Sequence, residues 1–191
     1  MSLETQINYT TKQGSIEVIC GSMFSGKTEE LLKRLKKCFF AKKKAIVFKP
    51  VIDSRYDNNN VVSHDKNTTE SVSIKKTDDI LILSKDYDVI AIDEAQFFSD
   101  DLVNVCNSLA GLGKRVIVAG LDMDFLGNPF GCMPKILAIA DYVSKIHAIC
   151  INCGNNANFS FRKTNEKSLI QIGEKKEYDA LCRHCFNKKS L

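Results

Sequence analysis

The sequence predicts an α/β fold in which helices cover a mostly parallel sheet, followed by a small C-terminal unit. Two observations predict it. Short apolar runs alternate with amphipathic stretches up to about residue 148, and four of the eight cysteines gather beyond that point. The chain has 191 residues, 44% of them hydrophobic and 26% charged. This composition is typical of one ordinary globular domain with a small appendage.

Each strand is predicted by a short apolar run between polar or glycine residues. The expected strands are 16–20, 45–48, 87–92, 115–119 and 143–149. A helix is expected from Glu29 onward, with one face formed by Leu31, Leu32, Leu35, Cys38 and Phe39. Two more are expected at 100–112, capped near Ser99 or Asp100, and at 134–140, with proline in the first turn.

Two segments interrupt this alternation. The stretch 53–66 is polar and rich in asparagine, which predicts a loop, and 71–74 allows an edge strand after it. From about Ala148 the apolar periodicity stops, and polar residues and cysteines take over. We therefore expect two domains, residues 1–148 and residues 149–191.

A glycine-rich motif of the form G-x-x-x-x-G-K-T connects the first expected strand to the first expected helix. It consists of Gly21, Ser22, Met23, Phe24, Ser25, Gly26, Lys27 and Thr28. In such a P-loop, backbone N–H groups surround phosphates, the lysine reaches the β- and γ-phosphates, and the hydroxyl binds Mg²⁺. The alternative is a plain turn with a surface lysine and threonine. The strand–loop–helix context favours a nucleoside triphosphate site, with ATP as the ligand.

The expected strand 87–92 runs directly into Asp93 and Glu94, which is the pattern of a Walker B strand. In a P-loop protein this aspartate holds Mg²⁺. The alternative is an ordinary strand that ends in solvated acids. Glu94 can accept a proton from a nucleophile. Water as that nucleophile would give an ATPase, and a substrate hydroxyl would give a kinase.

The C-terminal cysteines form two C-x-x-C pairs, Cys150 with Cys153 and Cys182 with Cys185. This pattern predicts a zinc ribbon, and four thiolates complete the coordination shell of a structural Zn²⁺. A redox dithiol is the alternative. The segment 167–178 between the pairs holds apolar residues and Gly173, so it allows a loop that closes over a ligand, or a ribbon hairpin without one.

The remaining features are less specific. The net charge of +4 is mild, and the basic residues Lys33, Arg34, Lys36 and Lys37 predict a solvated helix face rather than a nucleic-acid patch. Cys20, Cys38, Cys106 and Cys132 are expected in the core of a protein from a reducing compartment. No apolar run approaches the roughly 18 residues of a membrane span, and the first residues lack a signal-peptide core. We expect a cytoplasmic protein that binds neither membrane nor nucleic acid.

Taken in order, these motifs resemble the thymidine kinase family of the cellular and bacterial type. The resemblance runs from about residue 14 to 186. It is carried by G-S-M-F-S-G-K-T, by D-S-R at Asp53, Ser54 and Arg55, by D-E-A-Q-F-F from Asp93, by L-D-M-D-F-L-G-N-P-F from Leu121, and by both cysteine pairs. It implies a P-loop core with a lasso loop held by zinc.

The resemblance also implies roles for individual residues. Glu94 would take the proton from the 5′-hydroxyl of thymidine. The residues that match the ATP and phosphate site are the glycine motif with Asp53, Ser54, Arg55, Asp93, Glu94, Ala95 and Gln96. Those that match the thymidine site are Phe125, Tyr178 and the lasso residues Leu169, Ile170, Gln171, Ile172 and Gly173, with Met23, Leu121 and Phe130 as apolar walls. A homotetramer and feedback inhibition by thymidine triphosphate are implied as well.

Many relatives have a second small residue after the lasso glycine, whereas this chain has Glu174 there. Two other functions remain open from the residues alone. A nucleic-acid-stimulated ATPase would use the same Asp93 and Glu94 pattern, although helicases usually need two such domains. A non-enzymatic nucleotide sensor with a zinc module would show the same spacings.

Overall fold

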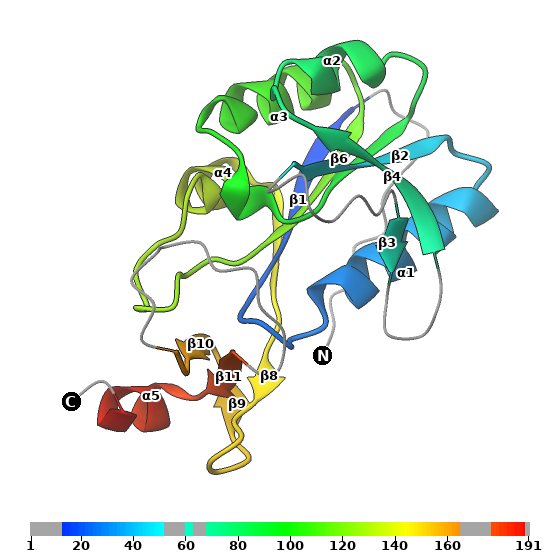
Figure 1. The fold of residues 1–191 in the computed structure, drawn as a ribbon. Coiled ribbons are helices and arrows are strands. Elements are labelled where there is room, and N and C mark those ends of the chain that lie inside the picture. Colours follow the sequence, from blue (N-terminus) through cyan, green and yellow to red (C-terminus); the bar gives the residue numbers. More distant parts are fainter. Residues whose placement is uncertain (1–12, 52–59, 63–67, 165–176, 190–191) are drawn as a thin grey trace.

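The computed structural model describes residues 13–51, 60–62, 68–164 and 177–189. Its centre is a seven-stranded sheet of order β3-β4-β2-β5-β6-β1-β7 (Figure 1). All neighbours in this sheet are parallel except β3 and β4, which are antiparallel. The expected α/β class with a mostly parallel sheet is thus confirmed.

The elements of the sheet and its helices follow in chain order. They are β1 (Ser15–Cys20), α1 (Lys27–Phe40), β2 (Ala45–Pro50), β3 (Asn60–Val62), β4 (Thr68–Ile74), α2 (Asp79–Leu83), β5 (Val89–Ile92), η1 (Ala95–Phe97), α3 (Asp101–Gly111), β6 (Arg115–Gly120), α4 (Met133–Ile139) and β7 (Tyr142–Lys145). Beyond them lie β8 (Ala148–Ile149), β9 (Asn156–Ala157), β10 (Phe159–Arg162), β11 (Tyr178–Leu181) and α5 (Arg183–Lys189).

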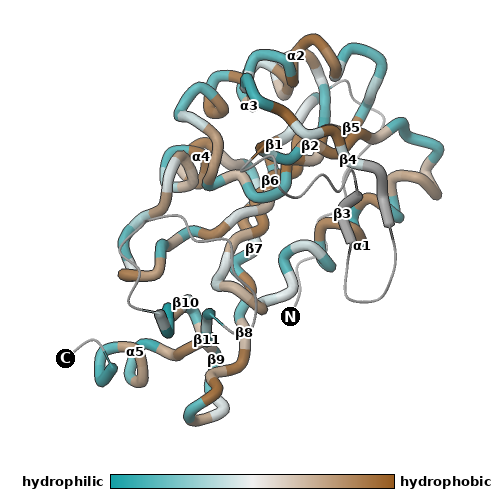
Figure 2. The backbone as a smooth tube through the Cα atoms, in the orientation of Figure 1, coloured by the Kyte–Doolittle hydropathy of each residue, from teal (hydrophilic) through white to brown (hydrophobic). Residues whose placement is uncertain are grey.

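The central strands alternate their side chains between two apolar cores, one on each face of the sheet. On one face α1 packs through Leu31, Leu32 and Leu35 against Ile19 and Ile117. On the other face, residues of α2, α3 and α4 pack against the opposite side chains of β1, β5 and β6. Figure 2 shows apolar residues concentrated on these inner strands. Burial on both faces explains why the strand sequences are almost entirely apolar.

The C-terminal unit, defined as the described residues from Ala148 onward, has a small core of its own. It contains two antiparallel pairs, β8 with β9 and β10 with β11, and α5. Its buried residues include Ala157, Phe159, Leu181 and Phe186, with the rings of Phe159 and Phe186 stacked at 4.4 Å between centroids. Met123 and Phe161 pack against this core. The division into domains 1–148 and 149–191 stays a prediction.

Several local expectations were wrong. The run 143–149 is not one strand: β7 pairs with β1, and β8 pairs with β9 in another sheet. The expected loop 53–66 contains β3, which pairs outside β4, so β4 is not the edge. Helix α2 and the 3-10 turn η1 were not predicted. The N-cap of α3 is Asp100, as expected, although its side chain makes no capping hydrogen bond.

Two side chains of α1 also differ from expectation. Phe39 was assigned to the apolar face but is 48% exposed. Arg34 was assigned to a solvated face, yet it forms ion pairs with Glu17 on β1 and Glu30. None of the helices in the described part of the chain combines the length and apolar character needed to cross a membrane.

Candidate functional site

The glycine motif forms the phosphate loop (residues 21–28), a tight turn that connects β1 to α1 and includes the first two residues of α1 (Figure 1). Gly21 and Gly26 have φ angles of 146° and 85°, which strain other residues. A Cβ atom on Gly21 would lie 2.1 Å from the backbone oxygen of Ile146. Phe24 adopts a φ of 64° without being glycine, so the loop stores backbone strain. The N-terminus of α1 follows at once and favours an anion.

Lys27 folds back on its own loop. Its Nζ donates to the backbone oxygen of Ser22 at 2.8 Å, and the Ser25 hydroxyl donates to the same oxygen at 2.8 Å. Burial lowers the pKa of Lys27, and the carboxylates of Glu94 and Asp93 oppose that shift. The ammonium group therefore lies in a partly desolvated site, next to acids and at the start of a helix.

Asp93 follows β5, and Thr28 lies in the first turn of α1, which follows β1; β6 lies between β5 and β1 in the sheet. The Thr28 hydroxyl donates to Asp93 Oδ2 at 3.4 Å. Burial and the neighbouring Glu94 raise the pKa of Asp93 to about 7. Carboxylate and hydroxyl oxygens are the ligands that Mg²⁺ prefers. The residues thus fit a divalent cation, whose charge would stabilise the buried carboxylate.

Glu94 is held in an unusual conformation beside Asp93. Its φ of 53° lies in the left-handed region, and its N–H donates to Asp93 Oδ1 at 3.0 Å. Gln96 Nε2 donates to Glu94 Oε2 at 2.5 Å. Gln96 in turn accepts the N–H of Leu121 at 2.9 Å, and a Cβ on Gly120 would lie 2.8 Å from its Oε1. The carboxylate of Glu94 is therefore oriented by β6 through Gln96.

Two charged residues near the phosphate loop were missed by sequence reasoning. Asp122 is buried after β6, and its Oδ2 contacts Lys145 Nζ at 2.6 Å. Its Oδ1 has no hydrogen-bond partner in the part of the chain that the structure describes. The negative charge of Asp122 opposes the lowering of the Lys27 pKa and adds to the rise of the Cys20 pKa that burial causes. The motif from Leu121 did contain Asp122, but nothing in the sequence indicated Lys145 as its partner.

The structure brings Phe125 and Tyr178 together through a third residue, Arg162. The Arg162 guanidinium lies 3.7 Å from the centroid of the Phe125 ring. Its Nε and Nη2 donate to the Tyr178 hydroxyl at 3.0 and 2.8 Å. Arg162 is only 6% exposed. Sequence reasoning missed it, although the alternation of Phe159 and Phe161 with polar residues is a strand signal that would have drawn attention to β10.

The expected apolar wall is partly assembled among the described residues. Phe130 is buried and meets Phe97 edge-to-face at 5.6 Å between ring centroids. Met23 and Leu121 are half-buried. Several expected residues lie outside the described residues: Asp53, Ser54, Arg55, Leu169, Ile170, Gln171, Ile172, Gly173 and also Glu174.

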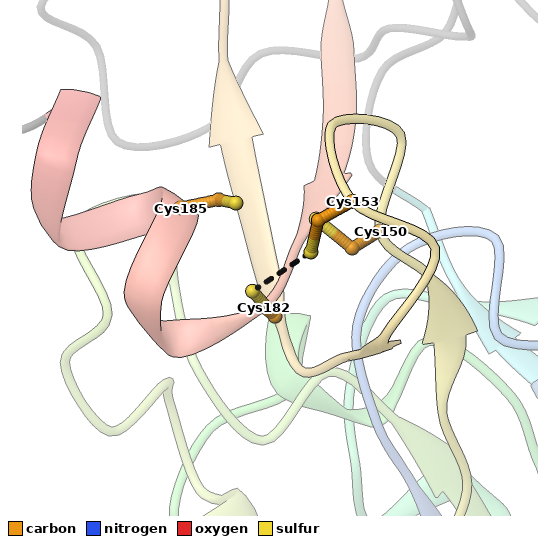
Figure 3. A group of neighbouring side chains, drawn as sticks. All are labelled: Cys150, Cys153, Cys182 and Cys185. Carbon is orange, nitrogen blue, oxygen red and sulfur yellow. Dashed lines mark hydrogen bonds between the residues drawn. The ribbon is translucent and has the colours of Figure 1, made fainter.

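The side chains of four cysteines converge within the C-terminal unit (Figure 3), namely those of Cys150, Cys153, Cys182 and Cys185. Their four Sγ atoms all lie within 4.8 Å of one another, and the Sγ atoms of Cys153 and Cys182 are 3.6 Å apart. A tetrahedral ion with Zn–S bonds of about 2.3 Å requires sulfur atoms about 3.8 Å apart. The four thiols fit such an ion after a small contraction, and they form a possible four-cysteine metal site.

The other four cysteines, Cys20, Cys38, Cys106 and Cys132, are buried as expected. Among the histidines, His184 is exposed within the second cysteine pair, and His147 bonds to Asn158. His64 lies outside the described residues.

Comparisons with known proteins agree on one family. The family model described as "Thymidine kinase" matches residues 14–186. A protein named "Thymidine kinase" from Bacteroides thetaiotaomicron is 54% identical over 96% of this chain and 92% of its own length. Proteins of the same name from Bacteroides fragilis and Porphyromonas gingivalis are each 52% identical, over 97% and 100% of this chain and 93% and 94% of theirs.

A solved structure titled "crystal structure of DNA replication initiation factor" aligns at a TM-score of 0.42 and 15% identity, over 69% of this chain and 40% of that chain. That likeness is too weak to support an inference.

Proposed function

The chain belongs to the thymidine kinase family, so the protein is an ATP-using kinase that phosphorylates thymidine, and on this premise we propose the roles of its residues. The observation that carries the proposal is the meeting of the phosphate loop, Asp93 and Glu94 at one end of the sheet. This is the combination of anion site, cation ligand and base that phosphoryl transfer needs.

We propose that Glu94 is the catalytic base. It removes the proton from the 5′-hydroxyl of thymidine as that oxygen forms a bond to the γ-phosphorus. The bond from the γ-phosphorus to the bridging oxygen breaks, and ADP leaves with that electron pair. The contact with Gln96 supports this role, because it fixes the direction of the carboxylate. The carboxylate of Glu94 is thus held in one orientation, in which it can accept the proton of the 5′-hydroxyl.

The residues proposed to bind ATP are those of the phosphate loop (Gly21, Ser22, Met23, Phe24, Ser25, Gly26, Lys27 and Thr28) together with Asp53, Ser54, Arg55, Asp93, Ala95 and Gln96. Lys27 exchanges its contact with the Ser22 oxygen for phosphate oxygens when ATP arrives. The loop N–H groups and Lys27 then stabilise the charge that spreads over the γ-phosphate. Thr28 and Asp93 are proposed to hold Mg²⁺, which neutralises phosphate charge when it is bound.

Thymidine is proposed to bind against Phe125 and Tyr178, under the segment that contains Leu169, Ile170, Gln171, Ile172 and Gly173. The buried contacts of Arg162 with Phe125 and Tyr178 support this placement, because they fix both rings. Backbone groups that recognise the base would be selective, since a wrong base leaves buried polar groups unpaired at a cost of about 1–3 kcal/mol each.

The four cysteines are proposed to hold a structural Zn²⁺ that ties together both ends of the substrate-covering segment. Their convergence supports a closed four-thiolate site. We further propose a cytoplasmic homotetramer that thymidine triphosphate inhibits, without nucleic acid as a partner. The family relationship supports these points.

The test is an assay of the purified protein with labelled ATP and thymidine, and separately with ATP and single-stranded DNA. We expect thymidine monophosphate to form and DNA to leave ATP hydrolysis unchanged. DNA-stimulated ATP hydrolysis without thymidine phosphate would point to an ATPase instead. Metal analysis of freshly purified protein is expected to find one zinc ion per chain.

A further inference from the structure

We propose that the C-terminal unit positions the phosphate loop itself, through a pair of hydrogen bonds from Ser22 and Met23, so that metal binding at the four cysteines governs ATP affinity. The inference rests on the proposed role of the phosphate loop in binding ATP. It goes beyond a role for the metal in holding the substrate-covering segment, because it concerns ATP in the absence of thymidine.

Two residues of the phosphate loop are bonded to the C-terminal unit. The Ser22 hydroxyl donates to the backbone oxygen of Ala157 on β9 at 3.2 Å. The Met23 N–H donates to Ser160 Oγ on β10 at 3.0 Å. Ser22, Ala157 and Ser160 are 2%, 0% and 4% exposed, so water does not compete freely for these bonds. The C-terminal unit thus contacts two of the four variable positions of the motif.

Ser22 is also the residue to which the rest of the loop is bonded. Its backbone oxygen accepts both the Lys27 ammonium and the Ser25 hydroxyl, each at 2.8 Å. The side chain of Ser22 therefore bonds to the C-terminal unit, while its backbone oxygen holds Ser25 and Lys27 in the loop. A shift of Ala157 would move Ser22, and with it the start of the phosphate loop and the resting position of Lys27.

On the other side, both contact strands are close in the chain to metal-ligand cysteines. Ala157 pairs with Ala148 across β8 and β9, and the turn between these strands is closed by Cys150, whose N–H donates to the Asn155 oxygen at 2.8 Å. Ser160 pairs with Ala180 on β11, two residues before Cys182 in the chain. A bound ion therefore ties both strands to one point.

The physical consequence follows from preorganisation. The C-terminal core is small, and a metal ion bound by four thiolates contributes folding free energy to a unit of this kind. Without the ion, β9 and β10 fluctuate more, and the loop must be ordered by ATP at the expense of binding free energy. A metal that held only the substrate-covering segment would leave ATP affinity unchanged when thymidine is absent.

The first experiment measures ATP affinity by titration calorimetry with Mg²⁺ and without thymidine. Ser160→Ala removes the acceptor of Met23 N–H, and we expect a three- to tenfold weaker Kd, about the effect of one hydrogen bond. Ser160→Thr keeps the hydroxyl and should restore the wild-type Kd. Ser84→Ala is the matched control, because this buried serine donates to the Ile80 oxygen far from the phosphate loop. Circular dichroism checks that each variant is folded.

The second experiment removes the metal with a chelator, exchanges the chelator away and restores Mg²⁺ before ATP is titrated. We expect about a tenfold weaker Kd in the wild type and a smaller further loss in Ser160→Ala, where one of the two bonds is already lost. Equal ATP affinity in Ser160→Ala and the wild type would overturn the inference, even if the metal-free protein unfolds. A wild type that binds no ATP would instead overturn the proposed function.

Discussion

Gln96 holds Glu94 by a hydrogen bond of 2.5 Å from its amide Nε2 to Oε2. The same amide group accepts the N–H of Leu121 at 2.9 Å, so it connects β6 to the carboxylate. Glu94 itself has a left-handed backbone with a φ of 53°. Backbone strain held by neighbouring contacts is typical of catalytic groups. The two residues act as one unit, and they can be tested separately.

Replacing Glu94 by glutamine should remove the base while keeping the size of the side chain. We expect kcat to fall about 10²–10⁴-fold, which is the usual contribution of a general base. ATP affinity should change little, because Lys27 and the loop N–H groups are untouched. Initial rates with labelled thymidine and a separate ATP titration check both points. Turnover at the wild-type rate would remove Glu94 as the base.

Replacing Gln96 by methionine keeps the volume but loses both hydrogen bonds. The Glu94 carboxylate is then free to rotate, and the expected result is a kcat lower by about ten- to hundredfold. The N–H of the half-buried Leu121 also loses its acceptor, which should cost about 0.5–1.5 kcal/mol of unfolding free energy. Steady-state kinetics and urea unfolding measure the two effects. A loss of stability with normal kcat would mean that Gln96 is only structural.

The sequence predicted the parts of the site that depend on local chemistry. The phosphate loop, Asp93 and the cysteine pairs are each read from a few adjacent residues, and their geometry is set by glycine and by the ends of strands. Contacts between distant segments were not predictable. Met23 with Ser160 and Phe125 with Arg162 join residues far apart in the chain, and no local pattern specifies such a pair.

The wrong expectations for the fold have a similar cause. The run 143–149 contains the apolar residues Val143, Ile146, Ala148 and Ile149, yet Val143 and Ile149 are 51% and 64% exposed. The strand of the main sheet ends with β7, because Ala148 pairs instead with Ala157 in the C-terminal unit. The sequence pattern predicted a solvated side chain for Arg34, but the fold brings Glu17 of β1 into an ion pair with it. Tertiary contacts overrode the local pattern in each case.

Replacing Glu17 by alanine should destabilise the sheet more than any surface ion pair does. Glu17 is 3% exposed and contacts Arg115 Nε at 2.5 Å and Arg34 Nη1 at 2.8 Å. Removing it leaves two neighbouring guanidinium groups without their shared carboxylate, at an expected cost of about 3–5 kcal/mol. Urea unfolding measures this.

The exposed pair Asp100 with Lys135 provides the control for Glu17. Asp100→Ala should change the free energy of unfolding by less than about 1 kcal/mol, since both side chains are solvated. Equal effects of the Glu17 and Asp100 changes would show that the buried contacts contribute nothing special.

Metal removal should expose only the C-terminal thiols to alkylation. Burial raises the pKa of Cys20 and Cys132 to about 11 and of Cys106 to about 12, and it also raises that of Cys38. At about pH 8 these thiols are protonated as well as buried, so iodoacetamide should spare them. Mass spectrometry of the native, chelated protein should find label on the four C-terminal cysteines alone. Early label on Cys106 would mean that the main core opens too.

Replacing Arg162 by lysine should weaken thymidine binding while leaving ATP binding nearly intact. Lysine keeps the charge but loses the planar group that stacks on Phe125 and donates twice to the Tyr178 hydroxyl. Both rings then lose a shared support, and we expect KM for thymidine to rise about tenfold with a smaller change in kcat. Arg183→Lys is the matched control, because Arg183 also stacks on a ring, that of Phe159, but is exposed. If Arg162→Lys alters kcat and KM for ATP as much as KM for thymidine, Arg162 supports the whole C-terminal unit rather than the nucleoside site.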